Sequence, residues 1–294
     1  MTSESSPSRS VPFSHVAFVG FGLVGGSLAR DLRGLPRPPK ITAVSTHPRE
    51  VEEGVAGGIL DAVTGGLEGA LGKADLVVYA TPVGAALRLL EEHRELWRPG
   101  AVLTDVGSLK ASVLEAAEEL GVGVRYVGSH PMAGGEGSGF SASREGIFRD
   151  ARVWLVAGEA PPEARRRVWD LWEAVGARPG WIDPLEHDRR MVWASHLPQL
   201  AANALALALE GAGLHPDDLG PGGRDTTRLA ASGPEMWRDL FRHAPGDLLT
   251  ALENLEGEVG RLRRLLEEER WEEVARAMKR TGNWKKGTPR KGTP

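Results

Sequence analysis

The sequence predicts an α/β fold with a doubly wound parallel sheet, followed by an all-helical domain. Between about residues 14 and 182, short β-rich runs alternate with helical patterns, and a glycine-rich turn follows the first run. Nearly continuous apolar strands separated by helices are typical of a parallel sheet that is covered on both faces. After Pro184 the β-branched runs stop and helices rich in Ala, Leu, Glu and Arg take over, which indicates a second domain.

The elements follow one another along the chain in a regular order. The apolar runs predict strands at 15–20, 41–45, 75–82, 101–108, 124–130, 151–158 and 180–183. Helical periodicity predicts helices at about 24–34, 162–176, 187–210 and 234–243, with further helices over 246–280. The predicted organisation is a disordered tail (1–12), a nucleotide-binding domain (13–184), a helical domain (185–281) and a second disordered tail (282–294).

Composition excludes several classes of protein. The 36 basic and 40 acidic residues give a net charge of −4, which argues against a broad nucleic-acid-binding surface. The chain has no cysteine, so disulfides, thiolate metal sites and cysteine nucleophiles are excluded, and no histidine pair predicts a metal site. It has neither an apolar run that would span a membrane nor a secretory signal. We therefore expect a cytoplasmic protein with no nucleic-acid or membrane partner.

The first strand leads directly into the glycine-rich sequence GFGLVG, residues 20–25. Gly20, Gly22 and Gly25 match the GxGxxG pattern of a Rossmann-type dinucleotide site, where they permit a tight turn, close approach of a pyrophosphate, and close packing of helix on strand. Leu23 and Val24 open the following helix, whose N-terminal N–H groups favour an anion. A GxGxxG match by itself is weak evidence. Here the motif follows a strand and opens a helix, so it predicts NAD or NADP binding.

The second strand ends without the carboxylate that usually binds the ribose 2′-hydroxyl of NAD. Ser45 and Thr46 stand there instead, with a histidine and an arginine close by, and such donors suit the 2′-phosphate of NADP. NAD remains open, because Glu50 or a main-chain group would also serve the ribose. We expect Thr81 and Pro82, at the end of the third strand, to reach the same crevice.

The segment GSHPMAGGEGSG, residues 128–139, holds the strongest candidate for catalysis. It places His130 at the end of a strand, next to a proline, in a glycine-rich loop that also carries Glu136. A neutral imidazole can accept a proton from an alcohol while a hydride leaves the same carbon. The alternative is a histidine that only caps the loop by hydrogen bonds.

Two helical segments contain further polar candidates. His196 and Gln199 interrupt a segment, 187–210, that is otherwise apolar enough to be buried all round in a core or a subunit interface. Pro198 should bend this helix, and His187, on the opposite face of an ideal helix, is interpreted as structural. In the segment GGRDTTRL, residues 222–229, Arg228 is a candidate carboxylate ligand, although a solvated helix face is the alternative.

Taken together, these segments resemble the prephenate dehydrogenase family over about residues 14–280. The matching motifs are GFGLVGGSLA (20–29), TDVGSLK (104–110), GSHPMAGGEGSG (128–139), HDRRMVWASHLPQ (187–199), RDTTRLA (224–230) and MWRD (236–239). The resemblance implies a Rossmann domain, a helical domain that dimerises, and NAD(P)-dependent oxidative decarboxylation of prephenate to 4-hydroxyphenylpyruvate in tyrosine biosynthesis.

The resemblance also implies roles for single residues. His130 corresponds to the catalytic histidine, Ser108 to a serine that contacts the substrate hydroxyl, Arg228 to the carboxylate-binding arginine and Glu136 to an acid lining the site. Gln199 stands where several prephenate-specific members have a second histidine. That departure keeps arogenate open as an alternative substrate. Chorismate mutase or regulatory domains, which the family often appends, do not fit in the tails, so tyrosine inhibition is expected to act at the active site.

Two other functions are weighed against this one. A different dehydrogenase with a Rossmann and a helical domain, acting on 3-hydroxy acids or pyrroline carboxylate, would explain the glycine motif but not residues 128–133 together with a distant arginine. A non-catalytic redox sensor would bind the dinucleotide, but the presence of both His130 and Arg228 argues against it.

Overall fold

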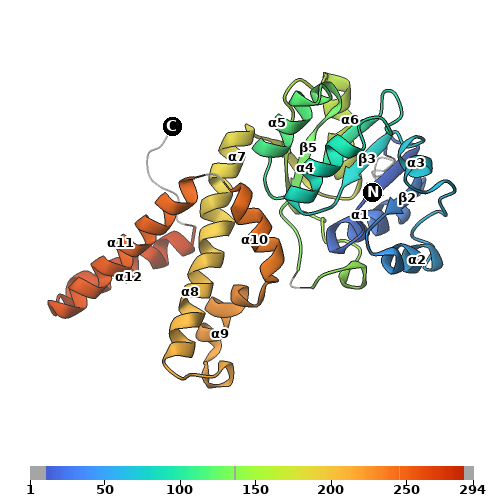
Figure 1. Cartoon of the computed structure of the whole chain (residues 1–294). Helices are drawn as coiled ribbons and strands as arrows, with labels where there is room; N and C mark the ends of the chain where they lie inside the picture. Colours follow the sequence, from blue (N-terminus) through green and yellow to red (C-terminus); the bar gives the residue numbers. More distant parts are fainter. Residues whose placement is uncertain (1–10, 136, 245, 288–294) are drawn as a thin grey trace, which may run out of the picture. The chain divides into compact units, whose positions relative to one another are not determined.

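The structure is a computed structural model that describes residues 11–135, 137–244 and 246–287. One compact unit extends to residue 244 and another begins at residue 246 (Figure 1). No helix among the described residues is long and apolar enough to cross a membrane. The boundary predicted near residue 184 and the cytoplasmic location stay predictions.

Four parallel strands form the main sheet of the first unit. They are β1 (His15–Val19), β2 (Lys40–Val44), β3 (Leu76–Tyr79) and β4 (Val102–Asp105), in the order β2-β1-β3-β4. Val16 of β1 pairs in register with Ile41 and with Leu76, and Leu76 pairs with Val102. Nearly every residue of these strands is buried, which confirms the parallel sheet that the apolar runs predict.

A second sheet continues from β4 and is mixed. It has the order β5 (Gly128–Pro131), β6 (Arg152–Val156), β7 (Arg178–Trp181), with β5 antiparallel to β6 and β6 parallel to β7. A parallel bridge from Leu103 to Tyr126 aligns β5 with β4. The predicted parallel sheet is confirmed in the main sheet, and the one departure is the antiparallel pairing of β5 with β6. The connection between them contains only the 3₁₀ turn η2 (Phe140–Ala142) and no crossover helix, so the chain returns in the opposite direction.

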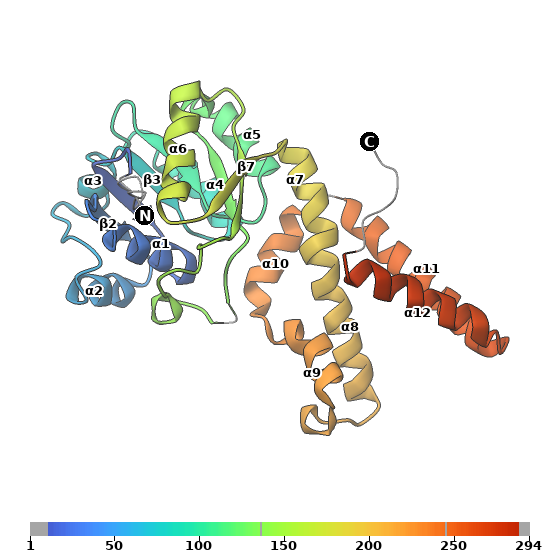
Figure 2. The same ribbon diagram turned by 180° about the vertical axis from the view of Figure 1, so that it is seen from behind.

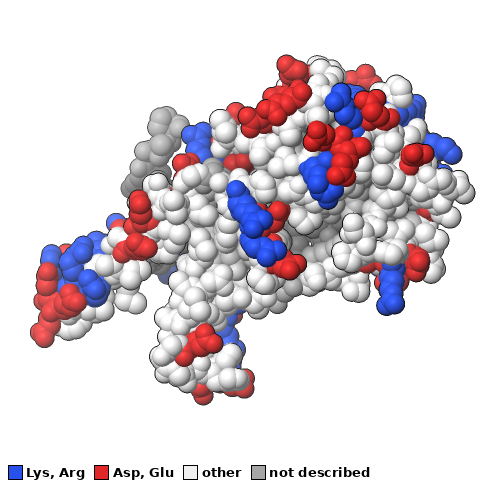
Figure 3. Space-filling view, viewed as in Figure 1, with Lys and Arg blue, Asp and Glu red and all other residues white. Residues whose placement is uncertain are grey.

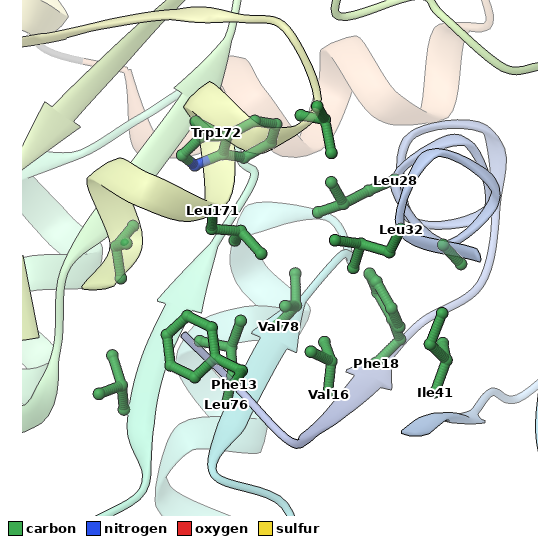
Figure 4. Packing of buried hydrophobic residues seen from close by; sticks show 14 of the residues in the cluster. Phe13, Val16, Phe18, Leu28, Leu32, Ile41, Leu76, Val78, Leu171 and Trp172 are labelled. Atoms are coloured by element: carbon green, nitrogen blue, oxygen red, sulfur yellow. The ribbon is translucent and has the colours of Figure 1, made fainter. Parts of the chain in front are cut away.

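Helices cover both faces of the main sheet. Helices α1 (Leu23–Arg33) and α6 (Pro162–Ala174) lie on one face (Figure 2), and α4 (Val83–Glu92) and α5 (Ala111–Glu119) lie on the other (Figure 1). Alternate strand residues serve the two faces: Val16 and Phe18 pack with Leu28 and Leu32 of α1 (Figure 4). Helices α2 (Pro48–Ala56) and α3 (Gly66–Leu71) and the 3₁₀ turn η1 (Gly123–Arg125) complete this sheet half, residues 13–183.

The helical half of the first unit, residues 184–244, begins with one long helical segment. It comprises α7 (Pro184–Met191), the π-helical turn η3 (Val192–His196) and α8 (Leu197–Gly211). Asp183 caps its start by accepting a hydrogen bond from the Glu186 N–H at 2.9 Å. The π turn ends just before Pro198, where the sequence predicts a bend. The remaining elements are η4 (Pro216–Asp218), α9 (Pro221–Thr227), η5 (Arg228–Ala231) and α10 (Pro234–His243).

Helix α8 is not buried all round within one chain. Leu207 is 66% exposed and Leu205 is 39% exposed, so the expectation that the segment is buried all round in a core is wrong for its C-terminal part. The part of α8 visible in Figure 3 is largely free of charged side chains. Of the two predicted environments, only a subunit interface remains open for this apolar surface.

The second unit is a pair of helices, α11 (Asp247–Glu267) and α12 (Trp271–Lys285). Residues 282–285, predicted as part of a disordered tail, are helical. Gly282 continues the helix, whereas Gly287 takes the left-handed conformation (φ +67°) that often follows a helix end. Of the two predicted tails, residues 1–10 and 288–294 lie outside the described residues.

Candidate active site

The glycine-rich turn has the geometry that a dinucleotide site requires. Gly20 has a φ of +88°, and a Cβ there would lie 2.5 Å from the carbonyl oxygen of Ala80. A Cβ on Gly25 would lie 2.9 Å from the Cβ of Ala80, so this glycine is needed for close packing of α1. Next to Gly22, by contrast, the nearest atom to such a Cβ would be 3.9 Å away, on Gly139. The open space at Gly22 is where a pyrophosphate would approach the backbone.

A cavity of about 630 Å³ lies beside this turn. Of the residues predicted to bind the cofactor, the lining includes Gly20, Gly22, Ser45, Thr46, Thr81 and Pro82, whereas Leu23, Val24 and Gly25 form the first turn of α1 and are not among the lining residues. The first turn of α1 has no side-chain cap and no acidic residue, which suits an anion. The hydroxyl oxygen of Thr81 is buried without a hydrogen-bond partner among the described residues.

Other residues of the cavity were not predicted from the sequence. Arg88 and Glu92 of α4 form an ion pair of 2.7 Å and line it together with His93. Glu50, considered as a ribose ligand, also lines it, but its Oε1 accepts a hydrogen bond from the Phe140 N–H at 3.0 Å. Its carboxylate therefore already holds the loop that follows His130.

His130 and Ser108 lie at the same edge of the sheet as the glycine turn. Ser108 follows β4, and His130 stands near the end of β5, which continues the direction of β4. The carboxyl ends of parallel strands meet at one edge, so both residues lie on the side where ligands bind in such sheets. Neither residue is among those that line the nucleotide cavity itself.

A hydrogen-bonded chain orients the His130 ring. Its Nδ1 lies 2.9 Å from Nε2 of His187, and Nδ1 of His187 lies 2.7 Å from Oδ1 of Asp188. The Asp188 carboxylate only accepts, so His187 donates from Nδ1 and accepts at Nε2. His130 therefore donates from Nδ1, which leaves its Nε2 without a proton and free to act as a base.

Asp188 is held in turn by the start of α5. Its two carboxylate oxygens accept hydrogen bonds from the N–H groups of Lys110 at 2.8 Å and Ala111 at 3.0 Å. The chain from the helix N-terminus to His130 is thus continuous. Neither His187 nor Asp188 was predicted to be functional, although their adjacency at the start of a predicted helix is a signal that sequence reasoning could have used.

His187, interpreted from the sequence as a first-turn structural residue, lies near the start of α7 and is hydrogen-bonded to His130. Its expected position opposite His196 changes because the helix is not ideal. An α-helix turns by about 100° per residue, which would put His187 and His196 on opposite faces. The π turn adds one residue and rotates the following positions back by about 100°. The angle between the two positions about the helix axis therefore falls from about 180° to about 80°.

A buried charge network lies next to His130. Lys110 Nζ donates to Asp105 and, at 2.7 Å, to the carbonyl oxygen of Ser129. Asp105 also accepts hydrogen bonds from the Tyr126 hydroxyl at 2.5 Å and the Gly107 N–H at 2.8 Å. These bonds satisfy the buried charges that an apolar core would otherwise not tolerate.

The surroundings of His130 keep its ring neutral. Burial holds the pKa of His130 well below its ordinary value. The nearby His187, Lys110 and His196 also disfavour a positive charge on this ring and lower its pKa further. Because a neutral imidazole is the form that accepts a proton, the ring is ready to act as a base at and below neutral pH.

Buried polar atoms without partners gather in the helical half. Both ring nitrogens of His196, Oε1 of Gln199 and Nε1 of Trp237 have no hydrogen-bond partner among the described residues. His196 is fully buried, and its ring centroid lies 6.1 Å from that of Trp237. Such atoms are rare in folded proteins unless a ligand or water completes them.

The segment that carries Arg228 lies against this cluster. Gln199 Nε2 donates a hydrogen bond of 2.8 Å to the carbonyl oxygen of Leu229, the residue after Arg228. Arg228 itself is exposed at the start of η5. Glu136, the remaining predicted residue, lies outside the described residues. Among the described residues, no three His, Asp or Glu side chains gather where they would hold a metal ion.

Comparison with known proteins identifies the family. The family model "Prephenate dehydrogenase, nucleotide-binding domain" matches residues 28–179, and "Prephenate dehydrogenase, dimerization domain" matches residues 183–280. The chain belongs to the prephenate dehydrogenase family. This membership confirms the resemblance seen in the sequence and sets aside a dehydrogenase of another family.

Individual members of the family cover most of the chain. The prephenate dehydrogenase of Bacillus subtilis is 29% identical over 286 residues, which is 93% of this chain and 76% of that protein. The crystal structure of prephenate dehydrogenase from A. aeolicus in complex with hydroxyphenyl propionate and NAD+ matches with a TM-score of 0.86 and 30% identity, covering 95% of this chain and all of that one. Synechocystis arogenate dehydrogenase matches with a TM-score of 0.78 and 28% identity over 94% of this chain and all of that one.

Proposed function

We propose that this chain is an NAD(P)-dependent dehydrogenase that converts prephenate to 4-hydroxyphenylpyruvate and carbon dioxide. The observation that carries the proposal is the chain from Asp188 through His187 to His130, which leaves a neutral base at the ligand-binding edge of the sheet. Family membership supports the same reaction. The cofactor, when bound, supplies the acceptor for the hydride that leaves C4 of the substrate ring.

The residues at the glycine turn fit a dinucleotide. The open face of Gly22, the uncapped start of α1 and the unpartnered hydroxyl of Thr81 would hold its phosphates and ribose. At the end of β2, Ser45 and Thr46 line the cavity, and Glu50 is engaged by Phe140. Because hydroxyl groups stand at the end of β2 in place of a carboxylate, we propose NADP as the preferred cofactor.

His130 moves one proton in the reaction. Its Nε2 takes the proton of the C4 hydroxyl as the hydride leaves C4. The bond between C1 and its carboxylate then breaks, its electron pair completes the aromatic ring, and the phenolate oxygen takes the proton back from His130. Hence no proton is gained or lost overall. Ser108, half-buried at the end of β4, is placed to bind the same hydroxyl.

The helical half is proposed to bind the substrate's two carboxylates and side chain. Arg228 binds a carboxylate, and the unpartnered atoms of His196 and Gln199 line the pocket. Glu136 is assigned to the same pocket by the resemblance alone. Gln199 donates one of its two amide N–H groups to the carbonyl oxygen of Leu229, and its unpartnered Oε1 can only accept. An ammonium group would satisfy this oxygen, which favours arogenate, the amino-acid analogue of prephenate, as a second substrate.

One assay tests the reaction and both substrates. Purified protein is mixed with NAD+ or NADP+ and with prephenate or arogenate, and the absorbance of the reduced cofactor is followed. We expect turnover with prephenate. Turnover with arogenate alone would correct the substrate, and no turnover with any pair would refute the proposal in favour of a redox sensor.

The cofactor preference has its own variant. Ser45→Asp introduces a carboxylate that repels a 2′-phosphate and binds a 2′-hydroxyl, so the ratio of kcat/KM for NADP to that for NAD should fall about tenfold. Thr250→Asp, at an exposed hydroxyl side chain of α11 that does not line the cavity, is the control. An unchanged ratio in Ser45→Asp removes this residue from the choice of cofactor.

We also propose that two copies pair through the helical domain. The exposed Leu205 and Leu207 of α8 support this, as does the match to a dimerization domain. Leu207→Glu should convert a dimer to a monomer in light-scattering measurements. Val124→Glu, at a similarly exposed apolar residue of the sheet half, should leave the dimer intact. A monomeric parent protein would refute the pairing.

A further inference from the structure

A buried chain of three aromatic side chains ends at the dinucleotide cavity and takes no part in the proposed proton transfer. Trp97 Nε1 donates to the Tyr79 hydroxyl at 3.0 Å, and that hydroxyl lies 3.2 Å from Nδ1 of His93. The three side chains are at most 6% exposed. The rings of Tyr79 and His93 stack with their centroids 5.9 Å apart.

The donors along this chain determine where the His93 proton sits. An indole N–H can only donate, so the oxygen of Tyr79 accepts from Trp97. Among the described residues, the hydroxyl proton of Tyr79 has one acceptor in reach, Nδ1 of His93. Nδ1 therefore carries no proton, and the neutral ring carries its single proton on Nε2. Burial lowers the pKa of His93 and raises that of Tyr79, so both stay uncharged at neutral pH.

His93 belongs to the end of the cavity where the base of a dinucleotide would lie. The turn at Gly20–Gly22 marks the phosphate end and Ser45 marks the ribose. Helices α3 and α4 and the C-cap of α4 contribute to the lining the apolar side chains of Leu67, Ala85 and Leu89 and the polar groups of Arg88, Glu92 and His93. Arg88 and Glu92 form an ion pair with each other, whereas the Nε2–H of His93 has no acceptor among the described residues. This part of the lining therefore combines apolar side chains with a ring N–H that can donate to a ligand.

We propose that His93 recognises adenine by donating its Nε2–H to N1 of the base, and that Tyr79 and Trp97 are positioning residues that hold this tautomer. In adenine, N1 is an acceptor. In hypoxanthine, N1 carries a hydrogen and cannot accept, so a fixed donor opposite it would stay unpaired. The inference rests on the proposed function, because it requires a dinucleotide in this cavity.

Equilibrium binding without substrate tests the proposal. Dissociation constants are measured by calorimetry for NAD(P)+ and for its deaminated analogue, in which hypoxanthine replaces adenine. The parent protein should bind the analogue roughly tenfold more weakly, since a buried donor would lose its partner. His93→Leu should bind both equally. His93→Gln should restore discrimination, because an amide can accept from Tyr79 and donate to the base.

Nitrogen-15 NMR of labelled histidine tests the tautomer directly, with His93→Gln assigning the signal. In the parent protein without cofactor, His93 should carry its proton on Nε2. In Tyr79→Phe, which keeps the ring but removes the hydroxyl, the two tautomers should mix, and discrimination between the bases should fall.

The outcomes separate the inference from the function on which it rests. If the parent protein binds both dinucleotides equally, or if His93 carries its proton on Nδ1, the base-recognition role is wrong while the proposed function stands. If neither dinucleotide binds, the proposed function is wrong, and the base-recognition role that depends on it is wrong as well. Both decisive measurements use the parent protein, so a variant that fails to fold leaves them in place.

Discussion

Two clusters of buried polar groups in the first unit differ in how they are paired: the charge network beside β4 and the cluster around His196 in the helical half. Beside β4, the Asp105 carboxylate accepts from Lys110, Tyr126 and Gly107, so each charge has a partner. In the helical half, both ring nitrogens of His196 and the free oxygen of Gln199 have none among the described residues. The first arrangement supports stability, and the second leaves binding groups to be completed by a ligand.

The same contrast holds for apolar side chains. In the sheet half, β1, β3 and β4 are fully buried between helices. In the helical half, α8 exposes leucines that a soluble monomer would be expected to cover. The four parallel strands are therefore covered within one chain, whereas the exposed leucines of α8 are the surface that the proposed pairing with a second copy would cover.

The largest expected effect is a loss of stability, and it tests the buried charge network of Lys110 and Asp105. Lys110→Met leaves the Asp105 charge buried without its cation, so the free energy of unfolding in urea should fall by about 3–5 kcal/mol. The matched control is Arg166→Met, which removes the exposed ion pair between Arg166 and Asp170 and should cost less than about 1 kcal/mol. Equal losses in the two variants would show that the network is not what stabilises the sheet half.

Replacement of His130 tests its proposed role as the base that accepts the hydroxyl proton. His130→Asn keeps a hydrogen-bonding group but cannot accept the hydroxyl proton, so kcat should fall about 10²- to 10³-fold with little change in KM. Steady-state kinetics with prephenate measures both. An unchanged kcat would remove His130 from the proton transfer.

The pH dependence of the free energy of unfolding tests the buried, unpartnered ring of His196. Burial lowers the pKa of His196 to about 4, while an unfolded histidine titrates near 6.5. The unfolded chain then binds the proton more readily, so stability is full above 6.5 and decreases as the pH falls towards 4. The loss from this residue is on the order of 3 kcal/mol. His196→Leu should flatten this part of the profile in urea titrations, and an equally steep profile would contradict the buried, unpartnered ring.

The smallest expected effect concerns the carboxylate ligand. Arg228→Ala removes a charge-assisted hydrogen bond to the substrate, so KM should rise some tens of times while kcat changes little. Arg224→Ala, one helical turn earlier and also exposed, is the control and should leave KM near its parent value. If both variants raise KM equally, the effect belongs to net charge and not to a specific contact.

Local patterns were sufficient to predict much of the fold and part of the site. The strand after which Gly20 turns, and the helix that follows it, depend on neighbours in the sequence, so their positions were predicted closely. Motif resemblance singled out His130 and Arg228 in the same way. Neither the local patterns nor the motifs predicted that β5 pairs antiparallel with β6, because the relative direction of two strands depends on the path of the long connection between them.

The sequence by itself determined the layered α/β domain, the glycine turn and the residue types available for chemistry, because these follow from hydrophobic periodicity and the steric freedom of glycine. Only the tertiary structure decided which groups meet. It brought Asp188 and His187 to His130 across 57 residues of chain, and it rotated His196 towards them through a π turn. A ring's proton position and pKa depend on partners that are distant in sequence, so they are set by the packed fold and not by any local pattern.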